Sequence, residues 1–95
     1  MMDMNEARAA IDAADRELAA LFERRMEAVR AIAEEKRAKG LPLLDPAREA
    51  EKLDRAAGLI ADETLRPYFL DLLRSTMRVS RDYQRALLGR EEETV

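Results

Sequence analysis

One uninterrupted stretch of helix-forming residues constrains the fold of this chain more than any other feature. Residues 4–38 contain neither glycine nor proline and are rich in Ala, Glu, Leu and Arg, which are favourable in helices. Asp3 or Asn5 can cap the start of this segment, and Gly40 followed by Pro42 predicts its end. At 1.5 Å per residue, the predicted helix is about 50 Å long.

That length exceeds what the rest of the chain can cover. Shorter helices are predicted over about 46–61 and 66–89, with a short connection at 62–67 and a tail at 90–95 that we expect to be frayed. A compact chain of 95 residues has a radius of gyration of about 12 Å. We therefore expect one all-α domain over residues 1–95, with one long and two shorter helices, that forms an intertwined homodimeric helical bundle.

Composition excludes several classes of function. The net charge of −3 argues against a nucleic acid partner and against a basic membrane-binding face. The chain has no cysteine and no histidine, so thiol chemistry is excluded, and the commonest general base and metal ligand are missing. No export signal and no apolar stretch long enough to span a membrane is present in the sequence. We expect a cytoplasmic protein without a metal site or cofactor.

The inward face of the long helix carries charges where a core needs apolar side chains. Alternating steps of four and three residues define this stripe, whose members are Met4, Arg8, Ile11, Asp15, Leu18, Phe22, Arg25, Val29, Ile32 and Lys36. Buried cations need partners or water, because desolvating an unpaired charge is unfavourable. Arg8 and Lys36 lie near the helix ends, where they can reach solvent, and Asp15 can pair with an arginine. Arg25 lies mid-helix, which makes a solvated position harder to reach.

Polar residues also interrupt the other two predicted helices. Ser80 and Gln84 lie four residues apart on the inward stripe of the last helix, where a glutamine amide needs up to four hydrogen bonds. Such a glutamine can also fix the register of a bundle. Asp45 and Pro46 suit the start of the second helix, yet Arg48 places a cation at the positive end of the helix dipole.

Together, these cations and neutral donors predict a pocket for a small dianion or polyanion. The guanidinium group of arginine binds carboxylates through two parallel hydrogen bonds. The exposed N–H groups at the start of the second helix would add to the same anion site. For Arg48 the alternative is a surface position paired with Glu49 or Glu51. The residues that define the predicted pocket are Arg8, Arg25, Lys36, Arg48, Ser80 and Gln84.

The order and spacing of these residues resemble the all-helical class of chorismate mutases. That family carries an I-D-x-x-D-x-x-L pattern, an Arg-Met pair and a later lysine on its first helix. A D-x-x-R-E motif opens its second helix, and a Ser/Gln pair lies on its last. The matching segments here are Ile11–Leu18, Arg25–Met26, Lys36, Asp45–Glu49 and Ser80 with Gln84, within a resemblance that spans about residues 5–88.

The resemblance implies a homodimer that rearranges chorismate to prephenate in phenylalanine and tyrosine biosynthesis. This intramolecular rearrangement needs no nucleophile, metal or cofactor. Carried over by position, the catalytic residues would be Lys36, Gln84 and Arg25. Arg8 would bind the substrate in the partner chain's site. The other substrate-binding residues would be Arg25, Lys36, Asp45, Arg48, Glu49, Ser80 and Gln84.

Two alternatives stay open at this point. The same scaffold serves isochorismate pyruvate lyases and mutases of the amino analogue of chorismate, whose sites also hold an enolpyruvyl dianion with Arg and Lys. The Asp45–Glu49 segment and the Gln84 donor favour a plain mutase. The second alternative is a non-catalytic helical dimerisation module, in which Asp15 pairs with Arg8 or Arg25 between chains.

Overall fold

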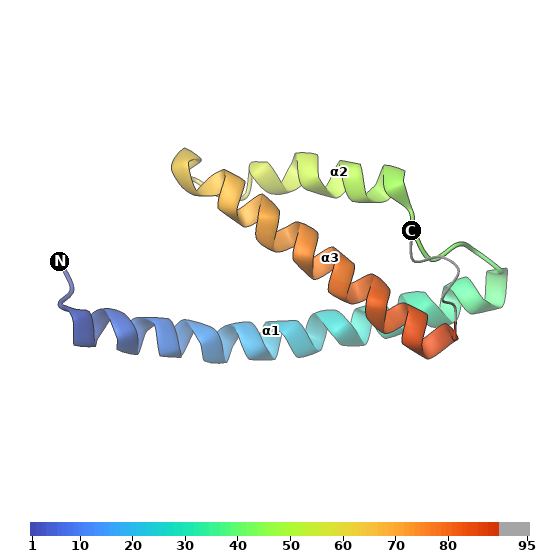
Figure 1. The fold of residues 1–95 in the computed structure, drawn as a ribbon, viewed down its shortest axis with the longest axis horizontal. Coiled ribbons are helices and arrows are strands. Elements are labelled where there is room, and N and C mark those ends of the chain that lie inside the picture. Colours follow the sequence, from blue (N-terminus) through green and yellow to red (C-terminus); the bar gives the residue numbers. More distant parts are fainter. Residues whose placement is uncertain (90–95) are drawn as a thin grey trace.

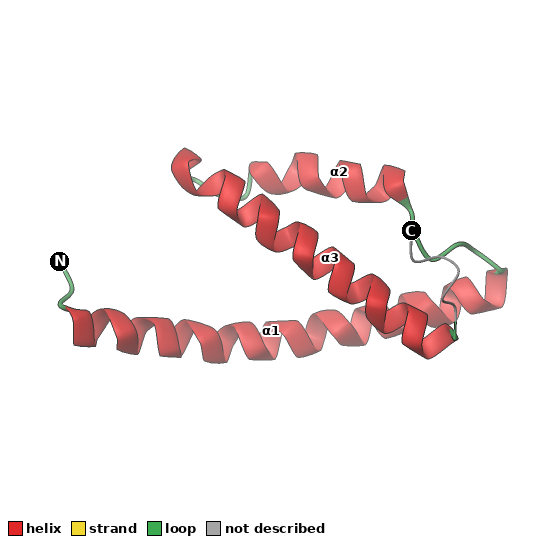
Figure 2. Cartoon of the chain, viewed as in Figure 1, coloured by secondary structure: helices red, strands yellow, loops and turns green. Residues whose placement is uncertain are grey.

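The computed structural model describes residues 1–89 as three α-helices joined by short connections (Figures 1 and 2). No strand occurs within these residues, so the expected all-α fold is confirmed. The expected tail at 90–95 lies outside the described residues. The elements are α1 (Met4–Lys39), α2 (Pro46–Ala57), the short 3-10 turn η1 (Glu63–Leu65) and α3 (Arg66–Leu88).

Both ends of α1 are closed by hydrogen bonds that the sequence indicates. The side chain of Asp3 accepts the Glu6 N–H at 2.8 Å. At the other end, Gly40 adopts a left-handed conformation with φ of 62°, which glycine tolerates without strain. The Leu41 N–H then donates to the Lys36 carbonyl at 2.9 Å. These caps fix where α1 stops and where the connection to α2 begins.

α2 is shorter than the sequence pattern predicts. The expectation of a helix over 46–61 is wrong at its C-terminal end, because α2 ends at Ala57. Glycine is a poor helix former, and at Gly58 the chain tightens into a turn. In that turn the N–H groups of Gly58 and Leu59 donate to the carbonyls of Arg55 and Ala56, at 3.2 and 3.0 Å.

α3 joins the other two helices. It packs against both α1 and α2, whereas α1 and α2 make no close backbone contact with each other in the described part of the chain. In Figure 1, α3 runs diagonally from α2 to the C-terminal half of α1. The buried apolar core is small and consists of Val29, Ala33, Leu43, Ala56 and Met77.

The N-terminal half of α1 extends beyond the rest of the molecule (Figure 1). The radius of gyration is 16.3 Å, against about 12 Å for a compact chain of this length. The buried residues of α1 are Val29 and Ala33, both in its C-terminal half. Ile11, Leu18 and Phe22 are 57%, 54% and 47% exposed. An apolar stripe of this kind needs a covering surface, and we expect a second copy of the chain to supply it.

Leu18→Glu should therefore produce a monomer at concentrations where the unchanged chain is dimeric. Burying one leucine contributes about 1.5–3 kcal/mol, and a two-fold interface loses that contribution twice. Sedimentation equilibrium at matched concentrations would measure the effect. Ala20→Glu is the control, because Ala20 is exposed on the opposite side of α1. A monomeric unchanged chain, or equal effects of the two substitutions, would contradict the prediction.

Candidate active site

A cleft of about 430 Å³ opens between the three helices. Its volume falls within the range of ~300–1,000 Å³ that is typical of small-molecule sites. The apolar part of its lining is Ala28, Val29, Ile32, Leu43 and Met77. The polar and charged part is Arg25, Lys36, Asp45, Arg48, Glu49, Lys52, Ser80, Arg81 and Gln84. Such a lining suits a small ligand that combines an apolar body with negative charges.

The expected site residues other than Arg8 all line this cleft. Arg8 is exposed on the N-terminal half of α1. Its distance from Arg25 along the helix axis is about 25 Å at 1.5 Å per residue. A single chain therefore does not bring Arg8 to its own cleft. The role of Arg8 in the partner chain's site remains a prediction.

Arg25 enters the cleft from α1, whereas its neighbour Arg24 is exposed. The Arg25 Nη1 donates to the Ser80 hydroxyl, which in turn donates to the Thr76 carbonyl at 2.9 Å. Ser80 is 6% exposed. Partial burial lowers the pKa of Arg25 because desolvation disfavours its charged form. The guanidinium remains charged at neutral pH, and its hydrogen-bonding partner is a neutral hydroxyl instead of an acid.

Lys36 lies in the last turn of α1 and faces the connection to α2. Its Nζ donates to the Leu43 carbonyl at 2.5 Å. Leu43 is 1% exposed, so the carbonyl that receives this bond belongs to a firmly packed residue. The bond sets the direction in which the ammonium group enters the cleft.

Gln84 is buried on α3 with its amide at the cleft. Its Oε1 has no hydrogen-bond partner among the described residues, and a buried polar group without a partner costs about 1–3 kcal/mol. No hydrogen bond joins Gln84 to α1 or α2 within residues 1–89, as a register-fixing glutamine would require. Rotation of the amide exchanges Oε1 and Nε2, so Gln84 can present N–H groups to a ligand.

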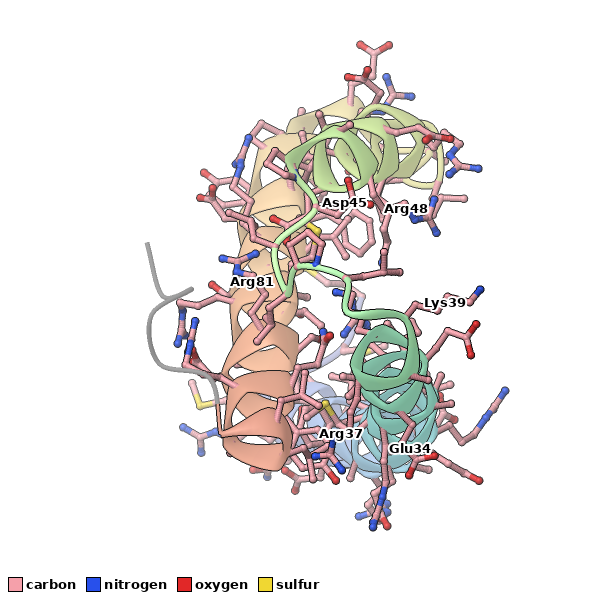
Figure 3. All side chains as sticks on the ribbon, turned by 90° about the vertical axis from the view of Figure 1, so that its right-hand side faces the viewer. Glu34, Arg37, Lys39, Asp45, Arg48 and Arg81 are labelled. Atoms are coloured by element: carbon pink, nitrogen blue, oxygen red, sulfur yellow. The ribbon has the colours of Figure 1, made fainter. Side chains whose placement is uncertain are left out.

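The start of α2 contributes an acid and a cation to the cleft. The Asp45 side chain caps the helix by accepting the Arg48 N–H at 3.1 Å. Figure 3 shows Asp45 and Arg48 at this end of α2 and Arg81 on α3, whereas Lys39 at the end of α1 points outward.

Glu49 is bound to α3 and not to Arg48. Its Oε2 accepts a hydrogen bond from Arg81 at 2.5 Å, and both side chains are about three-quarters buried, with 26% and 24% exposed. Glu51 instead pairs with Arg55 at 2.9 Å. The alternative in which Arg48 pairs with one of these two glutamates is therefore absent from the described structure. Arg48 itself is exposed at the edge of the cleft.

Two charged residues of the cleft, Lys52 and Arg81, lay outside the sequence-based expectations. Lys52 follows Arg48 by one helical turn, so the i,i+4 spacing was a readable signal that both share one face of α2. Burial lowers the pKa of Lys52, with smaller contributions from Arg25 and Arg48. Arg81 follows Ser80 and lies off the inward stripe, and no local pattern links it to a glutamate on another helix.

Comparison with known protein families gives a match over most of the chain. The sequence profile of the family described as chorismate mutase type II matches residues 7–85. That range contains all the expected site residues, and the resemblance seen in the motifs is confirmed. No curated protein and no solved structure matches the chain significantly.

None of the three helices combines the length and the apolar character needed to cross a membrane, as far as residues 1–89 are concerned. In the same part of the chain, no group of three or more acidic side chains is arranged to hold a metal ion.

Arg81→Met should lower the free energy of unfolding by about 1–2 kcal/mol, because it leaves the largely buried Glu49 carboxylate without its cation. Urea unfolding would measure this change. Arg55→Met is the matched control, since the Arg55–Glu51 pair is 62% and 61% exposed and exposed pairs contribute ~0–1 kcal/mol. Equal losses in the two variants would show that the Arg81–Glu49 pair is no stronger than a surface pair.

Proposed function

The chain belongs to the chorismate mutase type II family, whose members are isomerases, and on this premise we propose how its cleft converts chorismate to prephenate. The observation that carries the proposal is the convergence of Arg25, Lys36 and Gln84 from two helices on one cleft. In the reaction an ether C–O bond breaks while a C–C bond forms within the same dianion, and no proton moves. Catalysis then consists of positioning and charge stabilisation. The product would enter phenylalanine and tyrosine biosynthesis.

Arg25 binds one carboxylate of the substrate in this mechanism. Its guanidinium lies at the cleft with a neutral partner, Ser80, so a carboxylate would supply the missing negative charge. Ser80 assists at the same carboxylate by turning its hydroxyl proton from the Thr76 carbonyl to the substrate. Arg48 adds positive potential at the edge of the cleft.

Lys36 and Gln84 donate to the ether oxygen, where negative charge develops as the C–O bond breaks. The Leu43 carbonyl already orients the Lys36 ammonium, and the Gln84 amide is buried at the cleft. Donors that are placed before the reaction need no reorganisation during it. Removing one such donor typically costs ~10²–10³-fold in kcat.

Glu49 and the backbone of Asp45 hold the ring hydroxyl. The Arg81 guanidinium occupies Oε2 of Glu49, and the second carboxylate oxygen accepts the hydroxyl proton in a hydrogen bond. Because the pair fixes the orientation of Glu49, the hydroxyl is recognised in one position on the ring. This recognition favours chorismate over its isomers.

The active form in this proposal is a homodimer in which Arg8 of each chain completes the other chain's site. Arg8 lies on the exposed N-terminal half of α1, next to the apolar side chains that need a covering surface. A second copy that covers this stripe brings its own α1 against the cleft side of the first chain. Arg8 would then bind the second carboxylate of the dianion.

The purified chain should convert chorismate to prephenate, and Arg25→Ala should lower kcat/KM by at least ~100-fold while the helical content is kept. Loss of chorismate absorbance measures the rate, and NMR identifies the product. Arg24→Ala is the matched control, since Arg24 is exposed. Pyruvate release from isochorismate instead would assign the lyase reaction, and inactivity with both substrates would leave a dimerisation module.

Mixing two inactive variants tests the role of Arg8. Arg8→Ala and Arg25→Ala should each be inactive, but subunit exchange between them forms heterodimers with one intact site. Half of the dimers are then mixed and half of their sites are complete, so about a quarter of the normal activity should return. If Arg8 acts within its own chain, the mixture stays inactive.

A further inference from the structure

Lys52 is a cleft-lining cation that the proposed mechanism does not use. It lies one turn beyond Arg48 on α2, is half-buried, and also borders an adjoining hollow of about 300 Å³ between α2 and α3. No hydrogen bond or ion pair joins its ammonium group to another described residue. A flexible lysine at an exposed position would simply turn to solvent. This one lies where the cleft wall partly desolvates it.

The surroundings of Lys52 disfavour its charged form in the free protein. Burial, Arg25 and Arg48 all lower the pKa of Lys52, and Glu49 opposes them. Glu49 is already bound to Arg81 at 2.5 Å. Glu49, the acid that opposes the shift, is thus engaged elsewhere, while Arg25, Arg48 and Lys52 line the same cleft.

The cleft as a whole carries an excess of cations over acids. Its lining holds five basic side chains and two acidic ones, a balance of +3, in a chain whose net charge is −3. One of the acids, Asp45, is engaged as the cap of α2. A bound dianion would offset most of this excess. The concentration of positive charge at one place on an acidic protein therefore indicates ligand binding.

We propose that Lys52 is a substrate-binding residue whose ammonium group contacts a substrate carboxylate lying between Arg25 and Arg48. The inference rests on the proposed function and extends it to a residue outside the family motifs found in the sequence. A carboxylate has about four hydrogen-bond acceptor sites, so the Arg25 guanidinium and the Lys52 ammonium can bind the same group. Lys52 thereby strengthens the preference of the site for dicarboxylates over monocarboxylates.

The kinetic consequence follows from the charge on the carboxylate. A carboxylate keeps its charge throughout the rearrangement, so Lys52 binds the substrate and the transition state about equally well. Interactions of that kind lower KM and leave kcat nearly unchanged. Lys36 and Gln84, which face the developing charge in the proposed mechanism, should instead affect kcat.

Lys52→Met is the test, because methionine keeps an unbranched side chain and removes the charge. We expect KM for chorismate to rise about tenfold or more with kcat changed less than about threefold, and Lys52→Arg to restore most of the loss. Lys39→Met is the matched control, since Lys39 points outward and pairs with Glu35 on the surface. An unchanged KM, or a loss confined to kcat, would overturn the proposal.

Stability separates binding from a structural role. Because Lys52→Met removes an unpaired, partly desolvated cation, its free energy of unfolding should equal or exceed that of the unchanged chain. A fall in stability with an unchanged KM would give Lys52 a structural role and overturn the proposal. An unchanged chain without activity on chorismate would overturn the proposed function and the Lys52 role together. Normal turnover of chorismate by the unchanged chain, together with the same KM in Lys52→Met, would overturn the Lys52 role alone.

Discussion

The length of α1, relative to the helices available to cover it, is the constraint on which the rest of the structure depends. α1 has 36 residues, whereas α2 and α3 have 12 and 23. α3 covers α1 in its C-terminal half, so the buried residues of α1 and its part of the cleft lining both lie there. The N-terminal half carries exposed apolar residues and Arg8. One helix therefore has two unlike halves: one is packed and lines the cleft, and the other leaves its apolar stripe uncovered in the single chain.

Local rules predict the helices and most of the cleft, and they fail where a contact depends on how helices cross. Helical periodicity separates Arg25 from Arg24, because adjacent residues point in directions about 100° apart. Apolar periodicity extends the second helix to residue 61, because it counts spacing and takes no account of the low helix propensity of Gly58. The Arg81–Glu49 pair depends on the packing of α2 against α3. The sequence around Arg81 or around Glu49 does not indicate how closely α2 and α3 approach each other.

Polar groups in the cleft divide into those satisfied within the chain and those left without a charged or hydrogen-bonding partner. Glu49 and the Asp45 side chain belong to the first group. The Gln84 Oε1 and the Lys52 ammonium belong to the second within the described residues. The two acids hold the walls together, whereas an amide oxygen and an ammonium group remain without partners at the cleft. The free protein thus holds a buried acceptor and a partly desolvated cation that no described residue satisfies.

The hydrogen bond between Lys36 and the Leu43 carbonyl makes the length of the connection from α1 to α2 important. Surface loops ordinarily tolerate insertions and deletions. Here the backbone of Leu43 aims the ammonium group, and two residues later Asp45 opens α2. One residue more or less would leave the helices intact and still misdirect both groups. The connection behaves as a spacer of fixed length, so its residue count is as much a part of the site as any charged side chain.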